Sequence, residues 1–125
     1  MISPLIQVAL GGAVGASFRY VTVLGVTRLF GKGFPLGTVA VNFLGSFLMG
    51  VLVVVLAEKG GNRFAPLLMT GMLGGFTTYS SFSLDAITLF ERGHTGLAAL
   101  YVAGTLFLAL GGIALGLFVT RGVFA

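Results

Sequence analysis

Residues 34–57 read FPLGTVAVNFLGSFLMGVLVVVLA, 24 consecutive residues without a charge. About 20 apolar residues in a helix cross the roughly 30 Å hydrocarbon core of a bilayer. The stretches 64–84 and 95–120 are also uncharged, over 21 and 26 residues, and Arg19 alone interrupts residues 1–27. The sequence therefore predicts four membrane-spanning helices.

The composition supports a membrane protein. Of the 125 residues, 57% are hydrophobic and 8% are charged, whereas a soluble domain carries about 25% charged residues. Four spans leave only short connections near 28–33, 58–63 and 91–95, and no span shows the alternation of a β-barrel strand. We expect an all-α integral membrane protein in which residues 1–125 form a single four-helix transmembrane domain.

Several function classes are disfavoured. The net charge of +4 is scattered singly, without a run that could follow a phosphate backbone, so nucleic acid is not an expected partner. The chain has no cysteine and one histidine, His94, in a predicted loop. No nucleophile, base and orienting residue come together in the spans, so we predict that the protein is not an enzyme.

The basic residues are balanced between the two predicted sides of the membrane. Three fall on each side: Lys59, Arg63 and Arg121 on one, and Arg28, Lys32 and Arg92 on the other; adding Arg19 to its nearer end makes four against three. Because Lys and Arg set orientation, this chain could insert both ways round; a weak bias from the first helix is the alternative. Four thin helices also enclose little space, which favours a homo-oligomer.

Three polar residues recur at a spacing of four within residues 34–57. Thr38, Asn42 and Ser46 therefore lie on one helix face, with Asn42 about 12 Å along the helix from Phe34. Polar groups in lipid are costly, so each makes a structural hydrogen bond or belongs to a pathway. The aligned amide and hydroxyls favour a pore lining, and a structural hydrogen bond from Asn42 is the alternative.

Residues 74–83, GGFTTYSSFS, combine a glycine pair with five aliphatic hydroxyls between residues 77 and 83. Hydroxyls offer the backbone alternative hydrogen bonds, and glycine lowers helix propensity. We expect a helix break at mid-membrane, whose free carbonyls could hold a small cation such as Na⁺; a continuous helix is the alternative. Tyr79 and Phe82 flank this break, where edge-on rings can favour an anion.

The first span carries Gln7, Gly11, Gly15 and Arg19 at a spacing of four. This pattern predicts a close-packing face that ends in a cation. Arg19 either snorkels to the membrane interface or lies in an aqueous vestibule and attracts anions.

The fourth span repeats the spacing of four. Tyr101 and Thr105 could extend a polar track, and Gly112 and Gly116 predict helix packing. Asp85, after the hydroxyl run, is expected to be a solvated carboxylate.

Three blocks of sequence resemble the Fluc (also called CrcB) family of small fluoride channels. The first is residues 11–16, GGAVGA, leading to Arg19 and Tyr20. The second is Gly37 and Thr38 followed by residues 42–46, NFLGS, and the third is residues 74–83. Their order and spacing cover nearly the whole chain.

The resemblance implies an antiparallel, dual-topology homodimer with two fluoride pores and a central structural Na⁺. It assigns Asn42 as the pore asparagine, places Tyr79 and Phe82 at the two pore phenylalanines, and gives the Na⁺ the backbone carbonyls of Gly74 and Thr77. It also matches Arg19 to the family's first-helix arginine, and gives a polar track to Thr38, Ser81, Tyr101 and Thr105. The family pattern TTFSTF reads TTYSSF here, so Tyr79 could donate a hydrogen bond in place of a ring edge.

The implied function is passive export of fluoride from the cytoplasm across the inner membrane. Fluoride is small and strongly hydrated, so a pore must replace its water with closely placed donors. One alternative is a proton-coupled exporter of the small multidrug resistance type, which needs a carboxylate in the first helix; residues 1–20 contain none. The other is a non-transporting, holin-like assembly protein, which would leave the hydroxyl run unexplained.

Overall fold

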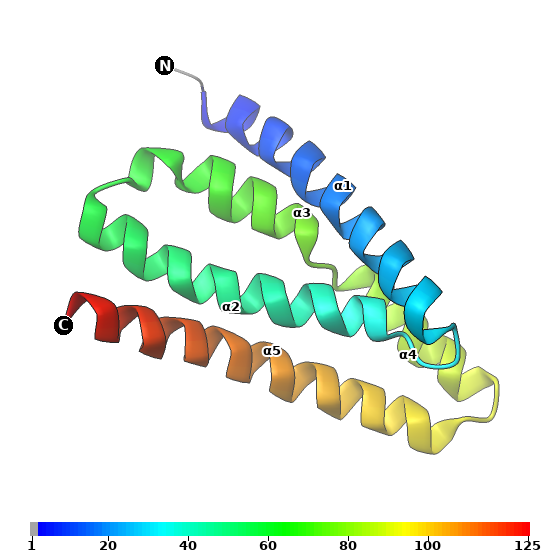
Figure 1. The fold of residues 1–125 in the computed structure, drawn as a ribbon. Helices are drawn as coiled ribbons and strands as arrows, with labels where there is room; N and C mark the ends of the chain where they lie inside the picture. The colour runs from blue at the N-terminus through cyan, green and yellow to red at the C-terminus, as the bar shows by residue number, and fades with distance from the viewer. Residues whose placement is uncertain (1–2) are drawn as a thin grey trace.

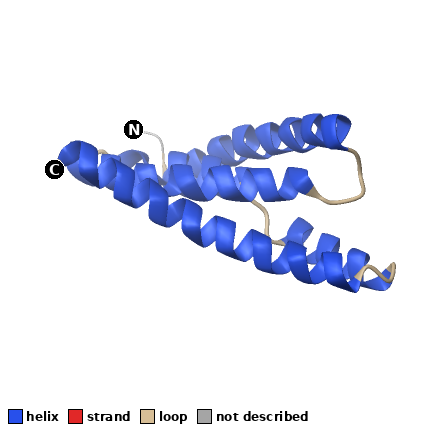
Figure 2. Cartoon of the chain, turned by 60° about the horizontal axis from the view of Figure 1, so that its bottom comes forward, coloured by secondary structure: helices blue, strands red, loops and turns tan. Residues whose placement is uncertain are grey.

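The computed structural model describes residues 3–125, and all regular elements in that range are helices (Figure 2). They are α1 (Pro4–Phe30), α2 (Leu36–Lys59), the 3₁₀ helix η1 (Asn62–Phe64), the π-helix η2 (Pro66–Leu73), α3 (Gly74–Phe76), α4 (Ser80–Glu91) and α5 (Thr95–Phe124). The predicted all-α class is confirmed.

Three helices are long and apolar enough to cross a membrane, namely α1, α2 and α5. They match three of the four predicted spans to within a few residues at most ends. The remaining stretch, 64–84, is divided among η1, η2, α3 and α4.

The predicted break in the third stretch is present at residues 77–79, between α3 and α4. Thr77 is extended, with φ −88° and ψ 161°, and its hydroxyl donates to the carbonyl of Leu73 at 3.0 Å. The Thr78 hydroxyl accepts the backbone N–H of Ser81 at 3.2 Å, which caps the start of α4. The alternative of a continuous helix is wrong: the Thr77 N–H still makes its helical bond to Leu73, but the Ser81 N–H bonds to the Thr78 hydroxyl in place of the Thr77 carbonyl.

The helices run back and forth between two ends of the molecule (Figure 1). The start of α1, the end of α5 and the turn after α2 lie at one end, and the turns after α1 and α4 lie at the other. Lys59, Arg63 and Arg121 therefore belong to one end, and Arg28, Lys32 and Arg92 to the opposite end, as the sequence predicted.

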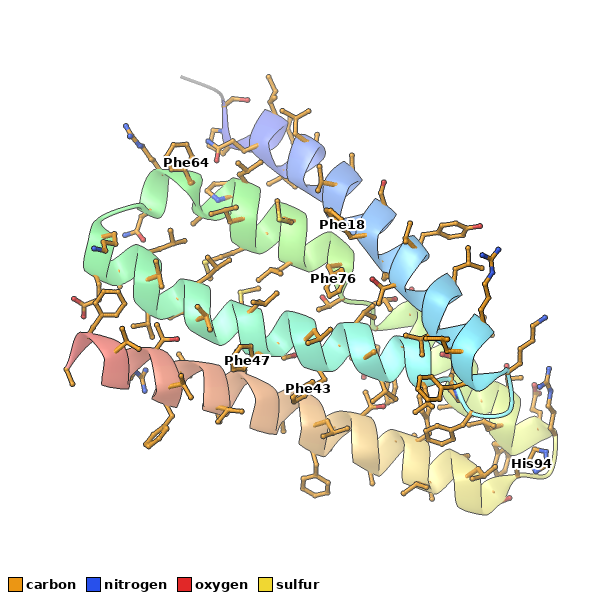
Figure 3. The ribbon with its side chains drawn as sticks, viewed as in Figure 1. Phe18, Phe43, Phe47, Phe64, Phe76 and His94 are labelled. Atoms are coloured by element: carbon orange, nitrogen blue, oxygen red, sulfur yellow. The ribbon has the colours of Figure 1, made fainter. Side chains whose placement is uncertain are left out.

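Glycines bring the helices into backbone contact. A Cβ atom on Gly15 would collide with the Met72 carbonyl in η2, and one on Gly116 would collide with the Phe47 carbonyl in α2. Figure 3 shows Phe47 where α2 meets α5. The small-residue faces predicted in the first and last spans are therefore helix contacts, α1 against η2 and α3, and α5 against α2.

Gly15→Ala should destabilise the protein by about 1–3 kcal/mol, because the added methyl group has no room between α1 and η2. The matched control is Gly25→Ala in the same helix, where a Cβ would meet nothing within 4 Å. That control should be neutral or stabilising by up to about 1 kcal/mol, since alanine favours a helix. Thermal unfolding in detergent checks both; equal stability of the two variants would contradict the packing described.

Candidate functional site

The amide of Asn42 pairs with the backbone of Thr78 at the break. Asn42 Oδ1 accepts the Thr78 N–H at 2.8 Å, and Asn42 Nδ2 donates to the Thr78 carbonyl at 3.0 Å. The side chain is buried. Asn42 therefore does make the structural hydrogen bond that the sequence left as an alternative, while one N–H of its amide remains for another acceptor.

These contacts free particular carbonyls. In a continuous helix the Gly74 carbonyl would accept from the Thr78 N–H, and the Thr77 carbonyl from the Ser81 N–H. Here those N–H groups bond to Asn42 Oδ1 and to the Thr78 hydroxyl. Within residues 3–125 the carbonyls of Gly74, Phe76 and Thr77 accept no hydrogen bond.

The neighbouring carbonyl of Gly75 is satisfied differently, because Arg19 Nε donates to it at 3.0 Å. Arg19 is also half-buried. Its burial and its bond to Gly75 hold the side chain at the break, which argues against the snorkelling alternative. The guanidinium also places a positive charge at the C-terminal end of α3, where a helix dipole favours one.

The donor set at the break fits a small hard cation. Unpaired carbonyl oxygens at the end of a broken helix are the groups that hold Na⁺ in membrane proteins. No cluster of three His, Cys, Asp or Glu that could hold a metal occurs in the part of the chain that the structure describes. A cation here would depend on backbone oxygens, and Gly74 is exposed on the surface of the single chain.

A cavity of about 360 Å³ lies beside the break and is called here the Asn42 cavity. Its polar wall includes Asn42, Ser46 and Thr105, and its aromatic wall is Tyr79 and Phe82. The Thr105 hydroxyl is buried and has no hydrogen-bond partner in residues 3–125. It is therefore a donor available to a ligand in the cavity.

The two rings at the break meet edge to face, with centroids 5.9 Å apart for Tyr79 and Phe82. Phe82 also packs on Tyr101, at 5.4 Å between centroids, whereas Tyr79 is 81% exposed. The Tyr79 ring therefore lies at the surface of the single chain.

A second cavity, of about 230 Å³, is called here the Arg19 cavity. Arg19, Thr38 and Ser81 line it, and Thr78 lines both cavities. Of the residues predicted to form the ion path, four line the Asn42 cavity, Thr38 and Ser81 line the Arg19 cavity, and Tyr101 lines neither. The vestibule role of Arg19 stays a prediction.

Asp85 was expected to be solvated, and this is wrong. It is half-buried, and its Oδ2 accepts the Thr38 hydroxyl at 2.9 Å and the Tyr101 hydroxyl at 3.0 Å. These two predicted donors are thus engaged with a carboxylate, and an anion would have to compete with Asp85 for them. The signal in the sequence was its spacing, because Asp85 follows Phe82 by three residues and shares its helix face.

His94 lies in the turn between α4 and α5, at the end of the molecule and away from the break (Figure 3). It is exposed, and it belongs to neither cavity.

The profile of one protein family, described as "CrcB-like protein, Camphor Resistance (CrcB)", matches residues 6–117. The chain belongs to the CrcB-like family. The family assignment from residues 11–20, 37–46 and 74–83 is confirmed, and with the apolar helices it makes this CrcB-like chain a multi-pass integral membrane protein.

Similar proteins share nearly the full length of this CrcB-like chain. "Fluoride-specific ion channel FluC" of Cereibacter sphaeroides (strain ATCC 17029 / ATH 2.4.9) is 66% identical over 122 residues, covering 98% of both chains. Proteins with the same name from Ruegeria sp. (strain TM1040) and Paracoccus denitrificans (strain Pd 1222) are 53% and 52% identical, covering 98% and 96% of both chains. All three names describe ion channels, in agreement with the prediction that this protein is not an enzyme.

Proposed function

We propose that this protein is a fluoride-selective channel that exports fluoride passively from the cytoplasm across the inner membrane. The observation that carries the proposal is the break at residues 77–79, with a donor-lined cavity beside it. The names of the similar proteins support fluoride as the substrate.

The electrostatics of the break support an anion path beside a cation site. The end of α3 presents unpaired carbonyls and so a partial negative charge, whereas the start of α4 presents N–H groups and a partial positive charge. One break therefore offers separate places to a cation and an anion.

The Asn42 cavity contains the donors that a fluoride ion needs. The second amide N–H of Asn42, the free hydroxyl of Thr105 and the edge of Phe82 can replace water around the anion. No carboxylate or basic side chain lines this cavity, so no charged side chain in its wall would repel the anion or trap it. Ser81 would contribute from the Arg19 cavity.

We further propose that η2, α3 and α4 together form the fourth transmembrane pass, so that residues 1–125 act as one four-span domain. Two inverted copies would bring both breaks together at mid-membrane, with one pore along each copy. The carbonyls of Gly74 and Thr77 from each copy would hold a structural Na⁺. The positive charge of this ion would attract the carbonyl oxygens of both copies and so hold the two breaks together. The exposed positions of Gly74 and Tyr79 support a contact of this kind.

Passive transport is directly testable. Liposomes loaded with fluoride should empty when the protein is present and the membrane potential is shunted, without nucleotide or a proton gradient, because the sequence has no phosphate loop and, within residues 3–125, Asp85 has no second carboxylate beside it to relay a proton. Chloride should leave far more slowly. A fluoride electrode measures efflux; a rate equal to that of protein-free liposomes would refute the channel, and dependence on a proton gradient would favour the exporter alternative.

A further inference from the structure

We infer that Asn42 is a positioning residue for the cation site as well as a wall of the anion path. This inference rests on the proposed function, because it concerns the Na⁺ site at the break. It assigns to one side chain the coupling between the two sites.

The argument begins with the Thr78 N–H. This group has two acceptors within its reach in principle: the Gly74 carbonyl, four residues earlier, and the side chain of Asn42 in α2. In the structure it bonds to Asn42 Oδ1 at 2.8 Å, and the Gly74 carbonyl is left unpaired. Asn42 therefore keeps the Gly74 carbonyl available, because it accepts the N–H that would otherwise donate to that carbonyl.

The second bond of the same amide fixes the chain direction. Asn42 Nδ2 donates to the Thr78 carbonyl at 3.0 Å, so the two bonds together hold Thr78 as a neighbouring strand would. With Thr78 fixed, its hydroxyl accepts the Ser81 N–H at 3.2 Å, and the Thr77 carbonyl loses its helical donor as well. Both carbonyls that would bind Na⁺ are thus free because of one asparagine.

Without the Asn42 side chain, the Thr78 N–H has only the Gly74 carbonyl as an acceptor. The Thr78 N–H would lose its partner within the membrane, which is costly. It would return to the Gly74 carbonyl and continue α3 by one residue. A carbonyl that accepts this bond is a poorer ligand, so the site should bind Na⁺ more weakly.

Substitutions at Asn42 can separate the two roles. Asn42→Ala removes both the acceptor for the Thr78 N–H and the amide that faces the anion. Asn42→Asp keeps an oxygen acceptor for the Thr78 N–H, so the Gly74 carbonyl stays free, but it loses the donor to the Thr78 carbonyl and repels an anion. Ser46→Ala is the matched control, since Ser46 lies one turn further on the same face of α2 and lines the same cavity but makes no hydrogen bond to the break.

A spectroscopic readout is available because Thr77–Thr78 is the only Thr–Thr pair in the sequence. Protein labelled with ¹³C-carbonyl and ¹⁵N threonine gives a single one-bond carbon–nitrogen correlation, between the Thr77 carbonyl and the Thr78 nitrogen. Solid-state NMR in liposomes follows this signal while Na⁺ replaces N-methyl-D-glucamine at constant ionic strength. Fluoride efflux is measured in parallel.

The signal should move with Na⁺ in the wild-type protein and in Ser46→Ala, with equal midpoints. Asn42→Ala should need about tenfold more Na⁺, the upper end of what one hydrogen bond contributes. Asn42→Asp should lose fluoride efflux, yet its Na⁺ midpoint should be no more than about threefold higher than that of the wild-type protein. If Asn42→Ala does not assemble, the Na⁺ midpoint of Asn42→Asp tests the inference by itself.

A wild-type midpoint in Asn42→Ala, or loss of the Na⁺ response in Asn42→Asp, would overturn the inference while leaving the proposed channel intact. A wild-type protein whose signal does not respond to Na⁺ would overturn the cation site and this inference together. Absence of fluoride efflux with an intact Na⁺ response would refute the channel alone.

Discussion

Asn42→Asp should reduce fluoride flux by about a hundredfold or more. The change keeps the size of the side chain but sets a negative charge in the wall of the Asn42 cavity. A like charge about 4 Å from an ion costs on the order of 4 kcal/mol at the effective dielectric constant near a protein surface. Phe82→Ile, which keeps bulk but removes the ring edge, should reduce flux by at least about tenfold, or about 1.4 kcal/mol.

The control for these pore variants is His94→Ala, because His94 is exposed at the end of the molecule and lines neither cavity. Its efflux rate should equal that of the wild-type protein. All variants are compared in liposomes at equal amounts of assembled protein, judged by size-exclusion chromatography. Wild-type flux in both Asn42→Asp and Phe82→Ile would show that the path lies elsewhere, even though the family assignment would stand.

The balance of basic residues predicts an equally large effect on assembly. Neutralising Arg28, Lys32 and Arg92 to Gln leaves the basic residues of the loops at one end, and neutralising Lys59, Arg63 and Arg121 leaves them at the other. Because Lys and Arg are retained on the cytoplasmic side, each variant should insert in a single, opposite orientation. All six side chains are exposed, so the fold should tolerate their loss.

Each of these variants expressed alone should lose nearly all fluoride transport, since an antiparallel dimer needs both orientations. Co-expression of the two should restore it. Cysteine labelling from either side of the membrane checks orientation, because the natural chain has no cysteine. A variant that is fully active alone, with every copy labelled from the same side, would rule out the antiparallel dimer.

The sequence by itself determined the all-helical class, the positions of three membrane spans and the family. These properties follow from local information: uncharged stretches long enough to cross a bilayer, and short blocks such as residues 74–83. The break at residues 77–79 was also predictable, because its cause is local too. Glycine and hydroxyl side chains weaken a helix wherever they are concentrated.

The tertiary structure alone decided which groups at the break are used and which are free. Asp85 looked like a solvated carboxylate in the sequence, yet it accepts hydroxyls from Thr38 in α2 and Tyr101 in α5. Likewise, Arg19 bonds to Gly75, 56 residues away, and Asn42 to Thr78, 36 residues away. Hydrogen bonds between distant segments depend on how the helices pack, whereas spacing along one helix shows only which residues share a face and not which groups of another helix they meet.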